Sequence, residues 1–329
     1  MEHKLNRREF LAVSAYTVAG LTLGLARRSG AAEQVSAEGK FKHKLHKALI
    51  VEKPTEDLLK EVRDAGFEGV EAGILSRHDA AKIREVAERL GLQIHSVLRG
   101  WAKFNSNNAD EVESSLKTTI DAIGAAQAYG ADGVLLVPGR IGEMAIPEPW
   151  EFSIEFDDKT GHLISVVEKN NERYSKYIAA HNHAYDTFRT AIRRLIPTAQ
   201  KDGVVITVEN VWNNMFIDPR HMANFVDSFD SPWVRAYFDI ANHIKYTPPE
   251  QRIAVLGRRI VKCHVKDFKL NPDGRGGNFV NIRQGSVNWP VVRKALDEVG
   301  FNGWMTLEGS EELSLTERSR RMDLIIAGK

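Results

Sequence analysis

The sequence has little cysteine, no excess of charge of either sign and no long apolar run. Cys263 is the single cysteine among 329 residues, so no disulfide can form within the chain. There are 45 basic and 44 acidic residues and no lysine or arginine run, so the composition gives no support to nucleic-acid binding. The apolar, small-residue stretch 12–26 is shorter than the roughly 20 residues that a membrane-spanning helix needs.

The first residues resemble an export signal. The segment 6–11 (NRREFL) is close to the twin-arginine pattern, the stretch 12–26 follows it, and 27–32 resembles a cleavage region. We therefore predict that residues 1–32 are a bacterial twin-arginine signal and that 33–44 are a linker. The protein is then expected to be periplasmic or extracellular, with no stable membrane span once the signal is removed. An uncleaved anchor or a cytosolic extension is the alternative.

From residue 45 to 329, short apolar runs alternate strictly with helical periods. Recurrent strand–helix units predict a parallel sheet, and eight of them favour closure into a (β/α)8 TIM barrel of the α/β class. A doubly wound open sheet is the alternative. The expected strands lie at 47–52, 69–73, 92–98, 133–138, 204–209, 234–239, 259–265 and 303–308.

Residues 139–172 depart from this repeat, because they are too long for an ordinary strand-to-helix loop. Apolar and polar residues alternate around Asp158–Gly161, which predicts a β-hairpin insertion after strand four. A hairpin there would lie beside the mouth of the barrel, as a lid, as a surface for a partner or as a decoration. The sequence leaves the formation of a homo-oligomer open.

Four polar residues stand at the ends of successive expected strands: Glu209, Asp239, His264 and Glu308. Side chains at the carboxyl ends of barrel strands converge on one mouth, so we expect the four to meet there. Three carboxylates and an imidazole suit Mn²⁺, Mg²⁺ or Co²⁺ at least as well as Zn²⁺. Each residue taken alone is also consistent with an ordinary polar strand end.

The motifs around these residues resemble those of the xylose isomerase-like superfamily of sugar isomerases and epimerases. They are VVITVEN, YFDIANH, VKCHVKD and MTLEG, together with QGSVNW at 284–289, and the resemblance covers roughly residues 45–325. It implies that Glu209, Asp239, His264 and Glu308 bind one catalytic divalent metal ion, with Mn²⁺ the first choice. It also implies that Glu209 and Glu308 are the catalytic carboxylates.

The resemblance implies chemistry through an enediolate. Isomerising or epimerising a hydroxy-ketone removes a proton next to a carbonyl, and a metal ion stabilises the charge that develops. A carboxylate on each side of the substrate takes and returns the proton. We therefore expect a metal-dependent isomerase or epimerase of a small sugar or hydroxy-keto compound, and export favours an unphosphorylated sugar or a glycoside.

Further candidates for binding the substrate surround the four ligands. Lys266 lies two residues after His264 and faces the same side of its strand. Asn242 stands where many members of the superfamily have histidine, so a proton shuttle at this position does not carry over. Glu71 is an expected neighbour of the ligands. The candidates for substrate binding are Lys266, Asn242, His243, Trp212, His95 and Arg275, the last from the glycine-rich segment 273–278.

Other functions remain open at this point. The closest is a lyase or hydrolase-type enzyme that uses the same metal site on a 3-keto-glycoside and expels its substituent. A non-catalytic sugar-binding barrel is the next. The barrel endonucleases of similar fold need a richer His/Asp cluster and a basic surface, which the sequence does not show.

Overall fold

The structure is a computed structural model, and it describes residues 41–329. The expected export signal and most of the expected linker lie outside the described residues, so both remain predictions. No helix between residues 41 and 329 is long and apolar enough to cross a membrane.

The described chain forms a closed barrel of parallel strands in the order β1-β12-β9-β8-β7-β4-β3-β2. β1 closes the ring, since Ile50 lies opposite Glu71 of β2 and Leu49 opposite Leu307 of β12. The predicted α/β class and TIM barrel are therefore confirmed. The barrel strands are β1 (Leu45–Val51), β2 (Gly69–Ala72), β3 (Gln93–Trp101), β4 (Gly133–Val137), β7 (Val205–Glu209), β8 (Val234–Asp239), β9 (Ile260–Val265) and β12 (Gly303–Leu307).

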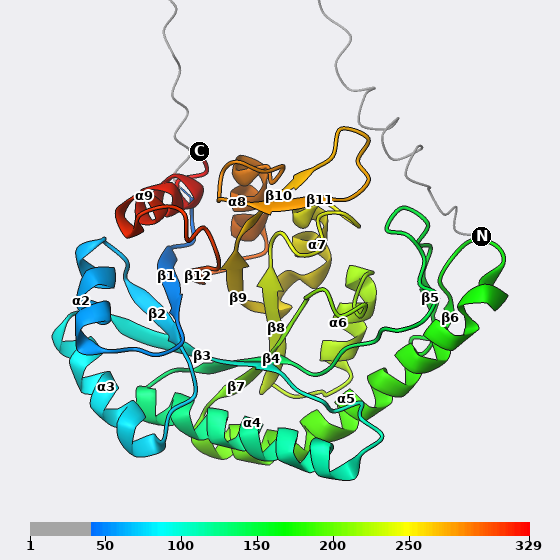
Figure 1. Cartoon of the computed structure of the whole chain (residues 1–329), viewed down its shortest axis with the longest axis horizontal. Coiled ribbons are helices and arrows are strands. Elements are labelled where there is room, and N and C mark those ends of the chain that lie inside the picture. The colour runs from blue at the N-terminus through cyan, green and yellow to red at the C-terminus, as the bar shows by residue number, and fades with distance from the viewer. Residues whose placement is uncertain (1–40) are drawn as a thin grey trace, which may run out of the picture. The chain divides into compact units, whose positions relative to one another are not determined.

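Helices surround the strands and cover their outer side (Figure 1). Their ends follow ordinary capping chemistry: the Thr55 side chain accepts a hydrogen bond from the backbone of Leu58, and Gly130 ends its helix in the left-handed conformation. The helices are α2 (Glu56–Asp64), α3 (Arg77–Arg89), α4 (Ala109–Tyr129), α5 (Ser175–Asp202), α6 (Pro219–Asp227), α7 (Pro249–Leu256), α8 (Trp289–Glu298) and α9 (Leu315–Ile326).

Apolar side chains pack in two separate clusters. The larger one fills the layer between strands and helices. The smaller one, here called the inner cluster, consists of Leu135, Val137 and Tyr237 with the partly buried Leu98 and Val211 against them. Its members come from β3, β4 and β8 and from the residues that follow β7, so both halves of the barrel contribute to it.

Two antiparallel hairpins depart from the barrel repeat. Within the segment 139–172, β5 (Glu155–Phe156) pairs with β6 (Leu163–Ser165). Further along, β10 (Asp267–Leu270) pairs with β11 (Gly277–Val280), where the sequence had indicated only a glycine-rich segment. The Arg275 guanidinium at the tip of this second hairpin lies 4.7 Å from the ring centre of Trp150. The β10–β11 hairpin therefore contacts the segment 139–172.

Candidate active site

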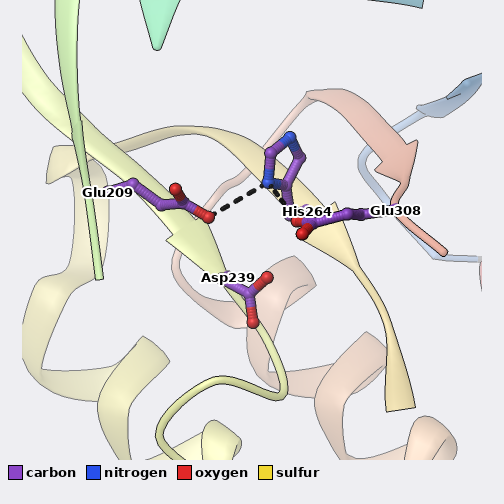
Figure 2. Close-up of side chains that lie close together, drawn as sticks. All are labelled: Glu209, Asp239, His264 and Glu308. Atoms are coloured by element: carbon purple, nitrogen blue, oxygen red, sulfur yellow. Dashed lines mark hydrogen bonds and ion pairs between the residues drawn. The ribbon is translucent and has the colours of Figure 1, made fainter. Parts of the chain in front are cut away.

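Glu209, Asp239, His264 and Glu308 converge at the carboxyl ends of their strands, as their positions in the sequence predicted. Each residue offers one potential ligand atom, and these atoms all lie within 4.8 Å of one another (Figure 2). The sheet register produces this arrangement, because Asp239 lies directly opposite His264 on the neighbouring strand. Glu209, Asp239 and His264 are buried and Glu308 is partly exposed.

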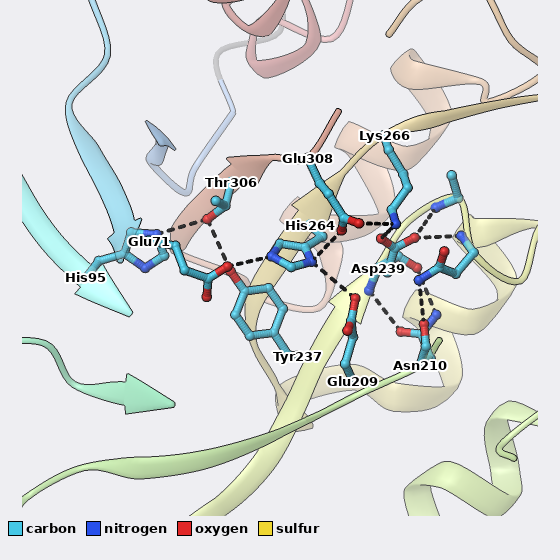
Figure 3. Close-up of polar contacts among 12 residues, drawn as sticks. Glu71, His95, Glu209, Asn210, Tyr237, Asp239, His264, Lys266, Thr306 and Glu308 are labelled. Carbon is cyan, nitrogen blue, oxygen red and sulfur yellow. Dashed lines mark hydrogen bonds and ion pairs between the residues drawn. The ribbon is translucent and has the colours of Figure 1, made fainter. Parts of the chain in front are cut away.

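His264 is the centre of the polar contacts. Its Nδ1 lies 3.1 Å from Glu209 Oε1 and 2.9 Å from Glu308 Oε2. Its Nε2 lies 2.7 Å from Glu71 Oε2 on β2, across the barrel (Figure 3). Burial alone would lower the pKa of His264, but the surrounding carboxylates, Glu71 first among them, raise it well above its usual value. Without a metal ion the imidazole therefore carries a positive charge and bridges three carboxylates.

The Asp239 carboxylate is only half satisfied. Its Oδ1 accepts hydrogen bonds from the backbone N–H groups of Ala241 at 2.9 Å and Asn242 at 2.6 Å. Its Oδ2 is buried and accepts no hydrogen bond from residues 41–329. Lys266 Nζ lies 3.3 Å from that oxygen, close enough for an ion pair but poorly directed for a hydrogen bond. Burial raises the pKa of Asp239 to about 7, against the opposing charge of Lys266.

Glu308 is held by two cations. Lys266 Nζ lies 2.6 Å from its Oε1, and His264 contacts its other oxygen. Burial raises the pKa of Glu308, but the hydrogen bonds and charges of His264 and Lys266 outweigh it and lower the pKa to about 2. Lys266 therefore forms ion pairs with Asp239 and Glu308, in addition to facing the same side of the chain as His264.

These contacts fit a divalent metal ion. The cluster offers three carboxylates and one imidazole, and Asp239 Oδ2 is a buried oxygen that accepts no hydrogen bond from the described residues and has only the Lys266 charge at 3.3 Å to offset its burial. Glu71 accepts the Nε2–H of His264, which fixes the ring and leaves the Nδ1 lone pair for a metal ion when the ring is neutral. The set is rich in oxygen ligands, which suits Mg²⁺ or Mn²⁺.

Two cavities meet at Glu308. The first, the mouth cavity, has a volume of about 930 Å³ and is lined by Glu209, His264 and Glu308 together with apolar residues of β1, β3 and β4 and of the segment after β2. Other charged residues line this cavity as well: Glu52, Lys53, Arg99, Glu311 and Arg318. The second, of about 590 Å³, lies beneath the β10–β11 hairpin and is lined by Lys266, Phe279 and Glu308 among others. Glu308 can therefore be reached from both cavities.

Three of the predicted substrate-binding residues hold the loop after β7 in place. Asn242 donates from Nδ2 to the backbone carbonyl of Asn210 at 3.0 Å, and the backbone carbonyl of Asn242 accepts a hydrogen bond from the Trp212 indole. His243 Nε2 lies 3.0 Å from the carbonyl of Val211. Asn242, His243 and Trp212 do not line the mouth cavity, although Val211 does.

The remaining predicted residues, His95 and Arg275, make no hydrogen bond or ion pair with the four ligand candidates among the contacts of residues 41–329. His95 is buried inside the barrel and stacks on Trp304, with ring centres 4.7 Å apart, and its Nε2 lies 2.9 Å from Thr306 Oγ1. Burial lowers the pKa of His95 well below its usual value, so the ring is neutral. Arg275 sits over Trp150 at the hairpin tip. Roles for these residues in substrate binding stay predictions.

Sequence reasoning missed Asn210, the residue after Glu209. Its Oδ1 accepts from the backbone N–H of Asp239 at 2.8 Å, and its Nδ2 donates to the carbonyl of Asp239 at 2.9 Å. This side chain therefore fixes the backbone of a neighbouring ligand, as Figure 3 shows. The only signal in the sequence was the Glu-Asn pair at the end of the strand.

The chain resembles known proteins over most of its length. A family described as xylose isomerase-like TIM barrel matches residues 59–323. No curated protein matches the sequence. Solved structures that are similar include a 3-keto-D-glucoside 4-epimerase from E. coli, at 13% identity and a TM-score of 0.63, covering 86% of this chain and 99% of that one.

Two further structures are similar over comparable lengths. A D-allulose 3-epimerase from Methylomonas sp. in complex with D-allulose has 14% identity and a TM-score of 0.60, covering 88% of this chain and 96% of that one. A xylose isomerase-like TIM barrel protein from Mycobacterium smegmatis in complex with magnesium has 19% identity and a TM-score of 0.58, with 87% and 96% covered. At these identities the likenesses show a shared fold. The match over residues 59–323 shows that the chain belongs to the xylose isomerase-like TIM barrel family.

Proposed function

We propose that the protein is a divalent-metal-dependent sugar isomerase or epimerase. One observation carries this proposal: Glu209 and Glu308, from β7 and from the residue after β12, approach the same His264 nitrogen from different strands. Two carboxylates beside one small-molecule cavity are what proton removal and return next to a carbonyl require. The similar structures named as sugar 3- and 4-epimerases support the same chemistry.

Each residue then has a part in holding the reactants. Glu209, Asp239, His264 and Glu308 would hold the metal ion, while Glu71 and Asn210 orient His264 and Asp239. When bound, the ion supplies positive charge for two neighbouring oxygens of a hydroxy-ketone. Mn²⁺ is the first candidate, and Mg²⁺, Co²⁺ and Zn²⁺ are to be compared with it.

The proton is moved by the chain's own carboxylates. Glu209 takes the proton from the carbon next to the carbonyl, and the electrons of that C–H bond move into an enediolate. For epimerisation, Glu308 first receives a proton from the Lys266 ammonium group 2.6 Å away and delivers it to the opposite face of the same carbon, after which Glu209 loses its proton to solvent and Lys266 regains one. For isomerisation, the proton returns to the neighbouring carbon. Lys266, which lies 2.6 Å from Glu308, supplies a donor for a substrate oxygen on that side.

Hydrogen exchange with solvent tests the proposal. A panel of ketoses is incubated in deuterated water with the protein and Mn²⁺, and loss of the C–H signal is followed by NMR. We expect Glu209→Gln and Glu308→Gln each to reduce exchange by on the order of 100-fold or more. Glu298→Gln is the matched control, because Glu298 is exposed on α8 and pairs only with Lys294 among the described contacts. Full exchange in either cluster variant would contradict the proposal.

A 3-keto-glycoside lyase or hydrolase-type reaction is the second candidate. It shares the first proton transfer but then expels the substituent. Asn242 favours considering it, because its side-chain amide and backbone carbonyl are both committed to the loop after β7 and offer no proton shuttle. Release of the substituent from a 3-keto-glycoside separates this reaction from epimerisation, which leaves the glycoside intact. A barrel that binds sugars without turning any over would leave both assays negative.

Export remains part of the proposal. A protein carried out of the cytoplasm meets free sugars and glycosides more often than sugar phosphates, so we infer that its substrate is unphosphorylated.

A further inference from the structure

We propose that the substrate is a glycoside whose aglycone is apolar and aromatic, and that this group binds in the N-terminal half of the mouth cavity. The inference rests on the proposed function, because the sugar ring must reach Glu209 and Glu308. It concerns the opposite side of the same cavity, where no part of the isomerase chemistry takes place.

The mouth cavity has two chemically different walls. The wall from β7, β9 and β12 carries Glu209, His264 and Glu308. The wall from β3 and β4, with Val211, is formed mainly by members of the inner cluster, since Leu98, Leu135 and Val137 line the cavity there. Arg99 lines it as well, but its guanidinium already donates to Thr119 Oγ1 and to the backbone carbonyls of Trp101 and Ser115. The side chains of Leu98, Leu135 and Val137 carry no polar atom, so these three residues, which form the apolar floor, offer no hydrogen bond to a hydroxyl group.

Trp101 stands at the edge of this apolar floor. It is the last residue of β3, lines the mouth cavity and leaves 48% of its surface exposed. An exposed indole that borders an apolar cavity wall offers a flat surface on which another ring can stack. The ring is also held in position, since Arg140 lies 5.4 Å from its centre and Arg99 donates to its backbone carbonyl. Arg99 in turn is tied to α4 through the Thr119 hydroxyl at 3.0 Å.

The size of the cavity also exceeds what one sugar needs. Its volume is about 930 Å³, near the upper end for small-molecule sites, and the carboxylates occupy only one side. A single sugar ring bound at the carboxylates would leave Trp101 and the inner-cluster floor in contact with water. An aromatic aglycone attached to that sugar would cover both and bury its own apolar surface.

A second sugar ring suits this wall less well. Its hydroxyl groups would lose water on entering and find no partners on Leu98, Leu135 and Val137, and an unpaired buried hydroxyl costs binding free energy. A flat aromatic ring loses little on leaving water and stacks on indole. The apolar floor and the exposed indole therefore favour an aryl glycoside over a disaccharide.

Paired ligands that cannot react test this inference. Methyl and phenyl β-D-glucopyranoside, and the same pair of xylopyranosides, differ only in the aglycone and lack the carbonyl that turnover needs. Isothermal titration with the full-length protein and Mn²⁺ gives their dissociation constants. We expect at least one phenyl glycoside to bind roughly tenfold or more tightly than its methyl partner.

Two variants locate the effect. Trp101→Ala is expected to remove most of the preference for phenyl while leaving methyl glycoside binding within about twofold. Trp150→Ala is the matched control, because Trp150 is similarly exposed, at 43%, but does not line the mouth cavity. Circular dichroism verifies that both variants are folded.

Three results would overturn the inference: equal binding of phenyl and methyl glycosides, an unchanged preference in Trp101→Ala, or no binding of either pair. Tighter binding of cellobiose than of the phenyl glycoside would assign the wall to a second sugar instead. The hydrogen-exchange assay with free ketoses uses neither aglycone nor Trp101. It therefore shows separately whether the proposed isomerase chemistry holds.

Discussion

Glu71 Oε2 lies 2.7 Å from Nε2 of His264, so a carboxylate on β2 contacts a predicted metal ligand on β9 across the barrel. Both side chains are buried. The carboxylate fixes which imidazole nitrogen carries hydrogen and therefore which one is free to bind a metal ion.

Glu71→Gln should weaken metal binding by about 10- to 100-fold, because the amide keeps the shape but loses the charge that makes the imidazole a better ligand. Titration of chelator-treated protein with Mn²⁺ measures the change. Glu68→Gln is the control, since Glu68 contacts a different histidine, His46, at 2.6 Å. Equal Mn²⁺ affinity in Glu71→Gln and the wild type would show that this contact does not support metal binding.

Gly161→Ala should destabilise the protein by about 2–4 kcal/mol, combining the cost of a left-handed alanine with that of overpacking. Gly161 has a φ of +76°, and a Cβ there would lie 2.0 Å from Cζ of Tyr185 on α5. Gly142→Ala, in the same insertion, meets nothing within 4 Å and should change stability little. Thermal unfolding of the two variants measures the difference in stability. Equal melting temperatures would contradict the predicted destabilisation by Gly161→Ala.

Stability should fall as the pH drops from 6.5 towards 4, in part because of His221. This buried imidazole lies 2.7 Å from the carbonyl of Gly161, and burial lowers its pKa from 6.5 to about 4. The unfolded chain therefore takes up a proton that the folded chain refuses, which removes up to about 3 kcal/mol over this range. Above pH 6.5 the ring is neutral in both states and contributes no pH dependence.

Urea unfolding at pH 7.5 and 5 measures this loss. His221→Gln should show a smaller difference between the two pH values than the wild type. His78→Gln, which alters an exposed histidine of α3, should show the same difference in unfolding free energy between the two pH values as the wild type. If His221→Gln loses as much stability at pH 5 as the wild type, another group is responsible.

The export prediction depends on Arg7 and Arg8. Residues 1–40 fused to a reporter that fluoresces after folding in the cytoplasm should carry it to the periplasm, because the twin-arginine route transports folded proteins. Replacing both arginines with lysine should leave the reporter in the cytoplasm. Cell fractionation distinguishes the outcomes, and export that survives the double replacement would argue against this route.

The sequence predicted the parts of the site that depend on strand direction. Glu209, Asp239, His264 and Glu308 each end an apolar run, and parallel strands in a closed ring bring such ends together whatever the loops do. The sequence placed Glu71 among the expected neighbours of the ligands but did not indicate that it contacts His264, because Glu71 lies almost 200 positions away on a strand that is not adjacent in the barrel.

Loop geometry was harder to predict. The segment 273–278 reads as flexible because of its glycines, yet Gly274 and Gly276 adopt positive φ angles and turn an antiparallel hairpin. Asn242 and His243 were expected to reach a substrate but bond to the backbone of the loop after β7. The hydrogen-bond partners of such side chains depend on which backbone carbonyls of the neighbouring loop lack a donor in the folded protein. The local sequence does not encode this.

The two walls of the mouth cavity come from separate stretches of the chain, with Val211 as the exception. Residues 49–137 contribute Trp101 and most of the apolar floor, and residues 209–308 contribute the metal-ligand candidates. Substitutions in the first half that spare Glu71 are therefore expected to alter which molecules the protein accepts while leaving Glu209 and Glu308 in place. For an engineer, libraries at the ends of β1 to β4 that keep Glu71 would explore new substrates without disturbing the residues proposed to move the proton.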